Sequence, residues 1–373
     1  MNLPVYDLLA LHLNINRTKG NESNPNYFTD NNINVMQRLK VLEKDEYLIL
    51  KTDPTYSLQK LKIPELKDIL RANNLKLTGK KQDLINRILD NLQSIDSNTL
   101  NLPAVYVATD KGKDLIEKTP YVKYFLNEYL IGLSRAHQIL KSNINVDDQI
   151  EFVYLTEIKY ELHQNLDNHR LSRLFESLAY YYLKADKDFA IVRKYYNLSY
   201  FVEVSERLPN NYLSLKSDDR ERYQLEPNFR ITEFYESQLL VHSVPENSLV
   251  DFFVSDITEF YEASTDICEA LAEYLIAYAK KDNQKKNYYA EQLFVYGDQM
   301  QSSSNYDEYI SDDLVTIDDT NNNYDQIDNI KIAEQNKYVE DTNPNNTVKD
   351  TLWGCGCLLF IVLAIAGCSA IIF

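Results

Sequence analysis

Residues 57–92 carry the pattern that most constrains the fold of this chain: two short amphipathic stretches separated by a glycine-containing turn. In the first stretch, Pro64 suits the first turn of a helix, where its missing N–H leaves no hydrogen bond unmade. Apolar residues then recur at helical spacing, at Leu66, Ile69 and Leu70. The same spacing returns after a Thr-Gly-Lys-Lys turn, at Leu84, Ile85, Ile88 and Leu89. The pattern predicts two helices, the second of which starts after Thr78 as its N-cap.

Several residues of this stretch stand at the spacing of a known family. They are Glu65, Leu66, Lys67, Leu75, Gly79, Lys80, Lys81, Leu84, Arg87, Ile88 and Leu89. On these residues the stretch resembles the SAP module, a compact helix–turn–helix unit associated with DNA binding. The resemblance covers only about a tenth of the chain. It implies a SAP-like module at residues 56–93 that is able to bind nucleic acid.

The turn of the module has the chemistry of an anion site. Backbone N–H groups at the start of a helix, together with the positive end of its dipole, favour a phosphate. The candidate nucleic-acid-binding residues are Gly79, Lys80, Lys81, Arg87, Lys76 and Arg71. Contacts of this kind position a protein on the nucleic-acid backbone and read little sequence. We therefore expect weak, phosphate-directed DNA binding; the alternative is a structural module whose lysines are only solvated.

The charge of the chain is unevenly distributed. The formal net charge is −17, which argues against a protein that coats nucleic acid with its whole surface. Residues 301–350 contain twelve Asp and Glu but three Lys, whereas residues 56–92 contain eight Lys and Arg against four Asp and Glu. The module is thus a small basic region in an acidic protein.

The segments that flank the module predict a small α+β unit. Helices are expected at residues 5–13 and 33–43, and strands at 47–50 and 104–109. A tight turn at residues 110–113 would lead into a helix at 114–118. The second strand and its turn resemble the wing of a winged helix. We therefore interpret residues 1–55 and 94–119 as two parts of a winged-helix-like unit with the module inserted between its strands; a plain α+β domain with a hairpin is the alternative.

Residues 120–300 predict an irregular antiparallel helical array. Apolar residues recur at steps of three and four through residues 122–140, 171–182 and 257–278. The turn at residues 185–188 joins two of the expected helices, as in a tetratricopeptide hairpin, but no steady repeat follows. Residues 208–249, with three prolines, are expected to form a looser crossing. The tyrosines at helical spacing are expected to pack rather than to stack on bases. An unknown protein partner is the expected ligand of this region.

The C-terminal part predicts a membrane anchor on a tether. Residues 301–350 are polar, acidic and without helical or strand periodicity, which is typical of a disordered segment. Residues 352–373 contain no charged side chain, and 22 residues of helix reach about 33 Å, enough to cross a bilayer. We expect a transmembrane helix at residues 351–373, and hence a single-pass, tail-anchored membrane protein. The absence of an N-terminal secretory signal and the position of Lys349 before the span indicate a body in the cytoplasm.

No constellation of residues predicts an enzyme, and neither catalytic nor metal-binding residues nor a cofactor are expected. The Thr-Gly-Lys-Lys turn lacks the upstream glycine of a phosphate-binding loop. Four cysteines, three of them in the last nineteen residues, do not form a disulfide framework. The richness in Asn and Tyr indicates an AT-rich, bacterial genome. The sequence thus predicts a mainly α, non-enzymatic protein that holds DNA weakly near a membrane; a membrane-anchored scaffold without nucleic-acid binding is the alternative.

Overall fold

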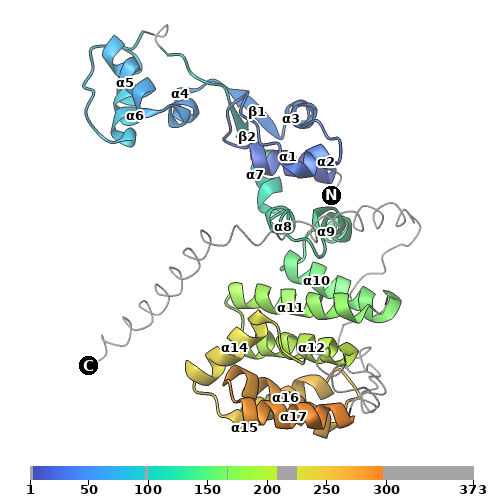
Figure 1. Ribbon diagram of the computed structural model, residues 1–373. Helices are drawn as coiled ribbons and strands as arrows, with labels where there is room; N and C mark the ends of the chain where they lie inside the picture. The colour runs from blue at the N-terminus through green and yellow to red at the C-terminus, as the bar shows by residue number, and fades with distance from the viewer. Residues whose placement is uncertain (1–2, 97–99, 166, 208–224, 297–373) are drawn as a thin grey trace, which may run out of the picture. The chain divides into compact units, whose positions relative to one another are not determined.

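The protein is mainly α-helical, as predicted, with one small sheet (Figure 1). The computed structural model describes residues 3–96, 100–165, 167–207 and 225–296, and the predicted tether and transmembrane segment lie outside these ranges. Within the described ranges there are sixteen α-helices, and none is both long and apolar enough to cross a bilayer.

The elements follow one another in a simple order. Up to the second strand they are α1 (Val5–Asn14), α2 (Asn26–Asp30), α3 (Val35–Lys44), β1 (Leu48–Lys51), α4 (Pro54–Ser57), the 3₁₀ helix η1 (Leu58–Lys60), α5 (Ile63–Ala72), α6 (Lys81–Asp90) and β2 (Val105–Ala108). The helical part follows with α7 (Asp110–Glu117), α8 (Tyr121–Phe125), α9 (Leu133–Leu140), α10 (Gln149–Tyr160), the π-helical turn η3 (Glu161–Asn165), α11 (Asn168–Lys184), α12 (Phe189–Arg207), α14 (Phe229–Leu240), α15 (Glu246–Thr258), α16 (Thr265–Ala279) and α17 (Asn283–Tyr296).

The two predicted strands pair with each other although 53 residues separate them. β1 and β2 run antiparallel, with Leu48 opposite Ala108 and Lys51 opposite Val105. All of α4, η1, α5 and α6 lies between the two strands in sequence. The predicted pairing of the two strands is therefore confirmed.

A third extended segment, which was not predicted, lies against the other edge of β2. Thr18 forms an isolated antiparallel bridge with Val105. The Asn16 N–H donates to the carbonyl of Tyr106 (2.8 Å), and the Tyr106 N–H donates to the carbonyl of Arg17 (3.0 Å). Among the described residues, β2 thus has backbone partners on both of its edges.

The predicted tight turn at residues 110–113 is wrong. These residues form the first turn of α7, which starts at Asp110 and not at residue 114. The Thr109 hydroxyl accepts a hydrogen bond from the Gly112 N–H (3.1 Å) and so caps the helix. Asp110 adds a negative charge at the positive end of the helix dipole. A cap and an acidic first turn were enough to start the helix one turn earlier.

Two of the predicted long helices are interrupted. The stripe through residues 122–140 is divided into α8 and α9, and Gly132 at the break has a φ of +77°. The stripe through residues 257–278 is divided into α15 and α16, with Ser264 as the N-cap of α16. By contrast, the pair α11 and α12 with its short turn is confirmed.

The buried apolar residues fall into two separate clusters. One contains residues of α1, α2, α3, the two strands and the helical array, and within it Tyr182, Tyr196 and Tyr200 are at most 1% exposed. These tyrosines pack in the interior, as predicted. The other cluster belongs to the inserted module alone: it comprises Leu58, Leu61, Leu66, Ile69, Leu70, Leu84, Ile85, Ile88 and Ile95. The module therefore has its own small core.

Candidate nucleic-acid interface

The turn between α5 and α6 depends on a glycine. Gly79 has a φ of +135°, a backbone conformation that L side chains rarely adopt. A Cβ built at this position would lie 2.8 Å from the Cβ of Asp83 in the following helix. Both observations give Gly79 a structural role in the turn, whether or not a ligand binds there.

The start of α6 differs from the prediction. The N-cap residue is Lys80, not Thr78, because the chain leaves the turn only after the positive φ of Gly79. The Lys80 N–H donates to the Asp83 carboxylate (2.8 Å), and the Lys62 N–H at the start of α5 donates to Glu65 in the same way (2.5 Å). A carboxylate of the module thus lies at the start of α6, where an anion was predicted, and another lies at the start of α5.

The two predicted arginines are engaged within the module. Arg87 donates to the carbonyl oxygens of Lys76 (2.6 Å) and Thr78 (3.0 Å), so it braces the turn. Arg71 forms an exposed ion pair with Asp68 one turn earlier in α5. Both arginines therefore already have partners within the module.

A group of lysines lies where the starts of α5 and α6 meet η1. The Lys81 ammonium donates to the carbonyl of Gln59 (2.7 Å), which holds η1 against the start of α6. Lys60, Lys62 and Lys80 flank this contact and are exposed, and within the described part of the chain their side chains have no hydrogen-bond or ion-pair partner. We call these three residues the lysine face.

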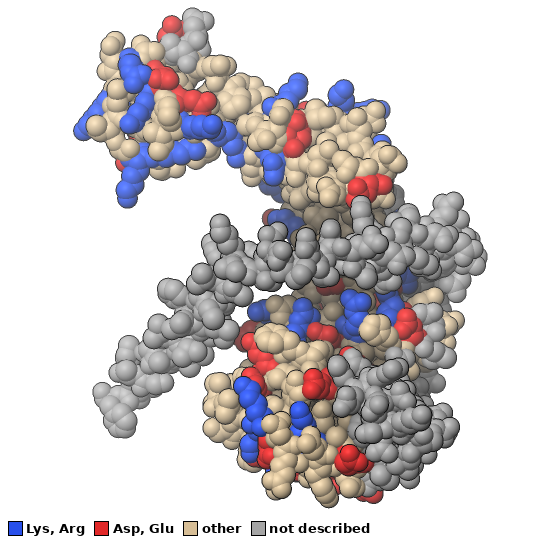
Figure 2. Space-filling view, in the orientation of Figure 1, with Lys and Arg blue, Asp and Glu red and all other residues tan. Residues whose placement is uncertain are grey.

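The lysine face brings together one predicted residue and two that sequence reasoning missed. Lys80 was predicted, whereas Lys60 and Lys62 were not, although their proximity to Pro64 at a helix start was a usable signal. Lys76 is exposed in the turn between the helices. Figure 2 shows Lys and Arg side chains gathered over the module, at its upper left. Residues 120–300, in contrast, contain 29 Asp and Glu against 19 Lys and Arg.

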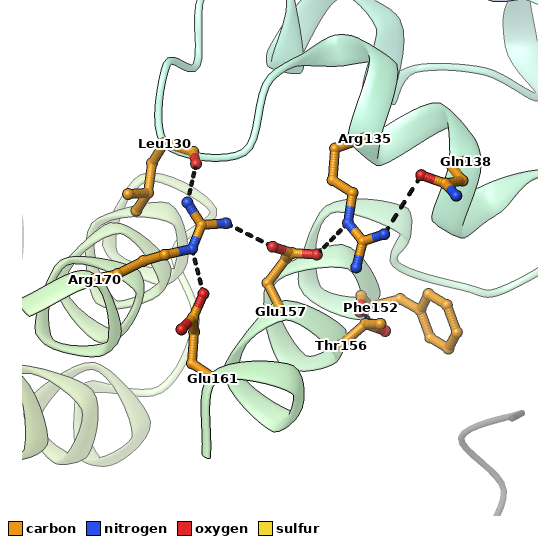
Figure 3. Close-up of polar contacts among 8 residues, drawn as sticks. All are labelled: Leu130, Arg135, Gln138, Phe152, Thr156, Glu157, Glu161 and Arg170. Atoms are coloured by element: carbon orange, nitrogen blue, oxygen red, sulfur yellow. Dashed lines mark hydrogen bonds and ion pairs between the residues drawn. The ribbon is translucent and has the colours of Figure 1, made fainter. Parts of the chain in front are cut away.

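A second polar cluster lies inside the helical array (Figure 3). Arg170 of α11 contacts Glu157 of α10 (2.6 Å) and Glu161 of η3 (2.5 Å), and it also donates to the carbonyl of Leu130 (2.8 Å). Arg135 of α9 contacts the other oxygen of Glu157 (2.6 Å). Both glutamates are at most 3% exposed. The positive charges of the two arginines equal the negative charges of the two buried glutamates. The cluster therefore has a structural role, because it joins α9, α10 and α11.

Two histidines of the described part of the chain, His12 and His137, are half-buried, and the described cysteine, Cys268, is buried. Burial and the neighbouring Lys123 lower the pKa of His12 to about 4, and its ring contacts the Thr119 hydroxyl (2.8 Å). Burial, and to a smaller extent the positive charge of Lys141, likewise lowers the pKa of His137 to about 4. Burial raises the pKa of the Cys268 thiol to about 12. No group of three His, Cys, Asp or Glu side chains among the described residues could hold a metal ion.

Residues 57–93 match the family model of the SAP domain. They form a SAP domain, which confirms the resemblance seen in the sequence and suggests DNA or RNA binding. No curated protein and no solved structure matches the chain. The match covers about a tenth of the chain, so it identifies this domain and not the whole protein.

Proposed function

We propose that this chain is a non-enzymatic adaptor whose SAP domain binds the nucleic-acid backbone weakly, through the lysine face. In this proposal the helical array binds a protein, and residues 352–373 hold the chain in a membrane. The observation that carries the nucleic-acid part is the SAP domain match, combined with three exposed lysines at one end of that domain that have no ion-pair partner among the described residues. Lysine ammonium groups bind phosphates as point charges and discriminate little between sequences.

The position of the carboxylates refines how phosphate is bound. Asp83 and Glu65 accept the N–H of the N-cap residue of each helix and place a negative charge at its start, which disfavours a further anion there. The ammonium groups of Lys60, Lys62 and Lys80 then supply most of the attraction. Three such contacts give weak binding with a salt dependence of about three phosphates.

We further propose that residues 3–118 form a winged-helix-like unit in which the SAP domain replaces the hairpin loop of the wing. The order α1, α2, α3, β1 and β2 supports this reading, as does the extended segment at residues 16–19 beside β2. The two ends of the insertion are also joined: the Ser57 hydroxyl donates to the carbonyl of Pro103 (2.8 Å). The strands thus hold both ends of the SAP domain.

The lysine face is tested by the variant Lys60→Ala/Lys62→Ala/Lys80→Ala. We expect its affinity for duplex DNA to fall at least about tenfold at about 50 mM salt, because three phosphate contacts are lost. The slope of log affinity against log salt should become shallower by about three. Fluorescence anisotropy of a labelled duplex, titrated at several salt concentrations, measures both quantities.

The matched control is Lys40→Ala/Lys44→Ala, which removes two exposed lysines from α3. It should leave the affinity within about twofold, since only distant charge changes. Equal binding by the triple variant and the wild type would contradict the lysine face. Absence of any salt-dependent binding would favour the alternative, a membrane-anchored scaffold without nucleic-acid binding.

The proposed membrane anchor rests on sequence alone, namely on the 22 uncharged residues 352–373. Its orientation would place the body in the cytoplasm. We expect deletion of residues 350–373 to move the protein from the membrane pellet to the soluble fraction after cell lysis. Extraction with carbonate at high pH separates an inserted chain from a peripheral one. A truncated chain that stays in the pellet would refute the anchor.

A further inference from the structure

Exposed apolar side chains concentrate around one helix of the array, α14, which is drawn in yellow in Figure 1. Its first residue, Phe229, is 76% exposed, and its last, Leu240, is 78% exposed. Val241, directly after the helix, is 65% exposed. Single exposed apolar residues are normal on a surface, but several on one element point to a contact that they make with another molecule.

The outward face of α14 has a regular pattern. Phe229, Glu233, Glu236 and Leu240 follow one another at steps of four, three and four residues, so they form one stripe along the helix. Glu233 is exposed and Glu236 is half-buried, and within the described residues neither forms an ion pair. The stripe is thus apolar at both ends and acidic in the middle.

The opposite face of α14 is well anchored, so the stripe is held in a defined orientation. The Tyr235 hydroxyl donates to the buried Asn197 side chain of α12 (2.7 Å). The ring of Phe234 lies 5.2 Å from the ring of Tyr196, centroid to centroid. Ile231 and Tyr235 are completely buried. A partner would therefore meet a preformed surface and not a helix that must first fold.

We propose that this stripe binds a basic amphipathic helix of a partner protein, whose apolar side chains lie three turns apart with Lys or Arg between them. The proposal rests on the protein-binding role proposed for the array and names the class of partner. Apolar residues at the two ends fit Phe229 and Leu240, and the cations fit Glu233 and Glu236. Because the steps of four, three and four residues are the same in both chain directions, a parallel and an antiparallel partner helix fit equally well.

Charge decides between this partner and other occupants. A second copy of α14 related by a two-fold axis would place glutamates opposite glutamates, and like charges in contact are costly. Nucleic acid is repelled by the same two carboxylates. A basic helix, in contrast, neutralises both glutamates while it covers the exposed phenylalanine and leucine.

The probe is a synthetic alanine-based helix of about 16 residues, long enough to be partly helical in water, that presents Leu, Lys, Lys and Leu at the same steps. We expect it to bind the full-length chain with a dissociation constant below about 100 μM. A second peptide with Glu in place of both Lys should bind at least about tenfold more weakly. Isothermal titration calorimetry measures both affinities.

A charge exchange gives the sharpest test. In Glu233→Lys/Glu236→Lys the preference should reverse, so that the acidic peptide binds at least about tenfold more tightly than the basic one. In Phe229→Ala/Leu240→Ala the basic peptide should bind at least about tenfold more weakly, because the apolar contacts are lost. Unchanged thermal unfolding of both variants shows that the array is intact.

Two results would overturn the proposal: equal binding of the two peptides by the wild type, or a preference that does not reverse in the charge-exchanged variant. Concentration-dependent dimerisation that Phe229→Ala/Leu240→Ala abolishes would instead assign the stripe to a second copy. DNA binding by the same variants is expected to equal that of the wild type. The SAP domain function and the stripe therefore fail or succeed independently.

Discussion

The variant Arg170→Met is expected to lower the free energy of unfolding by about 3–5 kcal/mol, because it removes a cation that contacts two buried carboxylates. Arg170 contacts both Glu157 and Glu161, and these side chains are 3% and 1% exposed (Figure 3). The carbonyl of Leu130 would lose its hydrogen bond as well. Chemical denaturation of the wild type and the variant, followed by circular dichroism, measures the difference.

Two further variants test the origin of this loss. Arg173→Met removes an exposed arginine one turn along the same helix, and it should change the unfolding free energy by no more than about 0.5 kcal/mol. In Arg170→Met/Glu161→Gln one of the two buried negative charges is removed together with the cation, so part of the lost stability should return. A loss below about 1 kcal/mol for Arg170→Met would mean that the buried pair is not what joins these helices.

The sequence predicted best where the determining contacts are local. The two helices of the SAP domain follow from apolar residues three and four positions apart, and these residues form the domain's own core. The strand pairing was predicted as well, from two apolar runs on either side of the module and the resemblance of the second run to a wing strand. The exact start of α6 was missed because the positive φ of Gly79 delays the helix to Lys81.

Helical periodicity did not predict where the array breaks. An apolar stripe keeps its phase across a short turn, so residues 122–140 look like one helix although α8 and α9 are separate. The exposed Tyr129 stands at a position of that stripe that a continuous helix would bury. The sequence contained a signal in Gly132, which commonly marks an interruption.

The sequence did not predict polar contacts between residues far apart in the chain. Glu157 and Arg170 lie on different helices, and no local pattern marks them as partners. The same holds for the SAP domain, where Lys81 is engaged by the carbonyl of Gln59, 22 residues earlier in the chain. Which cations remain free depends on the folded neighbourhood and not on the composition of the turn.

The second large effect is expected at Gly112, in the first turn of α7. Gly112 is buried, and a Cβ at this position would overlap the carbonyl oxygen of Tyr47, next to β1. The same carbonyl accepts hydrogen bonds from the backbone N–H (3.1 Å) and the hydroxyl (3.2 Å) of Thr109. Any added side chain must push α7 away from the strand and break the contacts that cap the helix.

We therefore expect Gly112→Ala to lower the free energy of unfolding by about 3 kcal/mol or more, although alanine normally favours a helix. The neighbouring variant Lys113→Ala loses only an exposed ion pair with Asp110 and should cost no more than about 0.5 kcal/mol. Thermal and chemical unfolding of both variants measures the contrast. If Gly112→Ala is as stable as the wild type, α7 does not pack against the backbone at Tyr47. The contact between Gly112 and Tyr47 is one reason to treat the paired strands, the inserted SAP domain and α7 as a single unit. A stable Gly112→Ala variant would remove that reason.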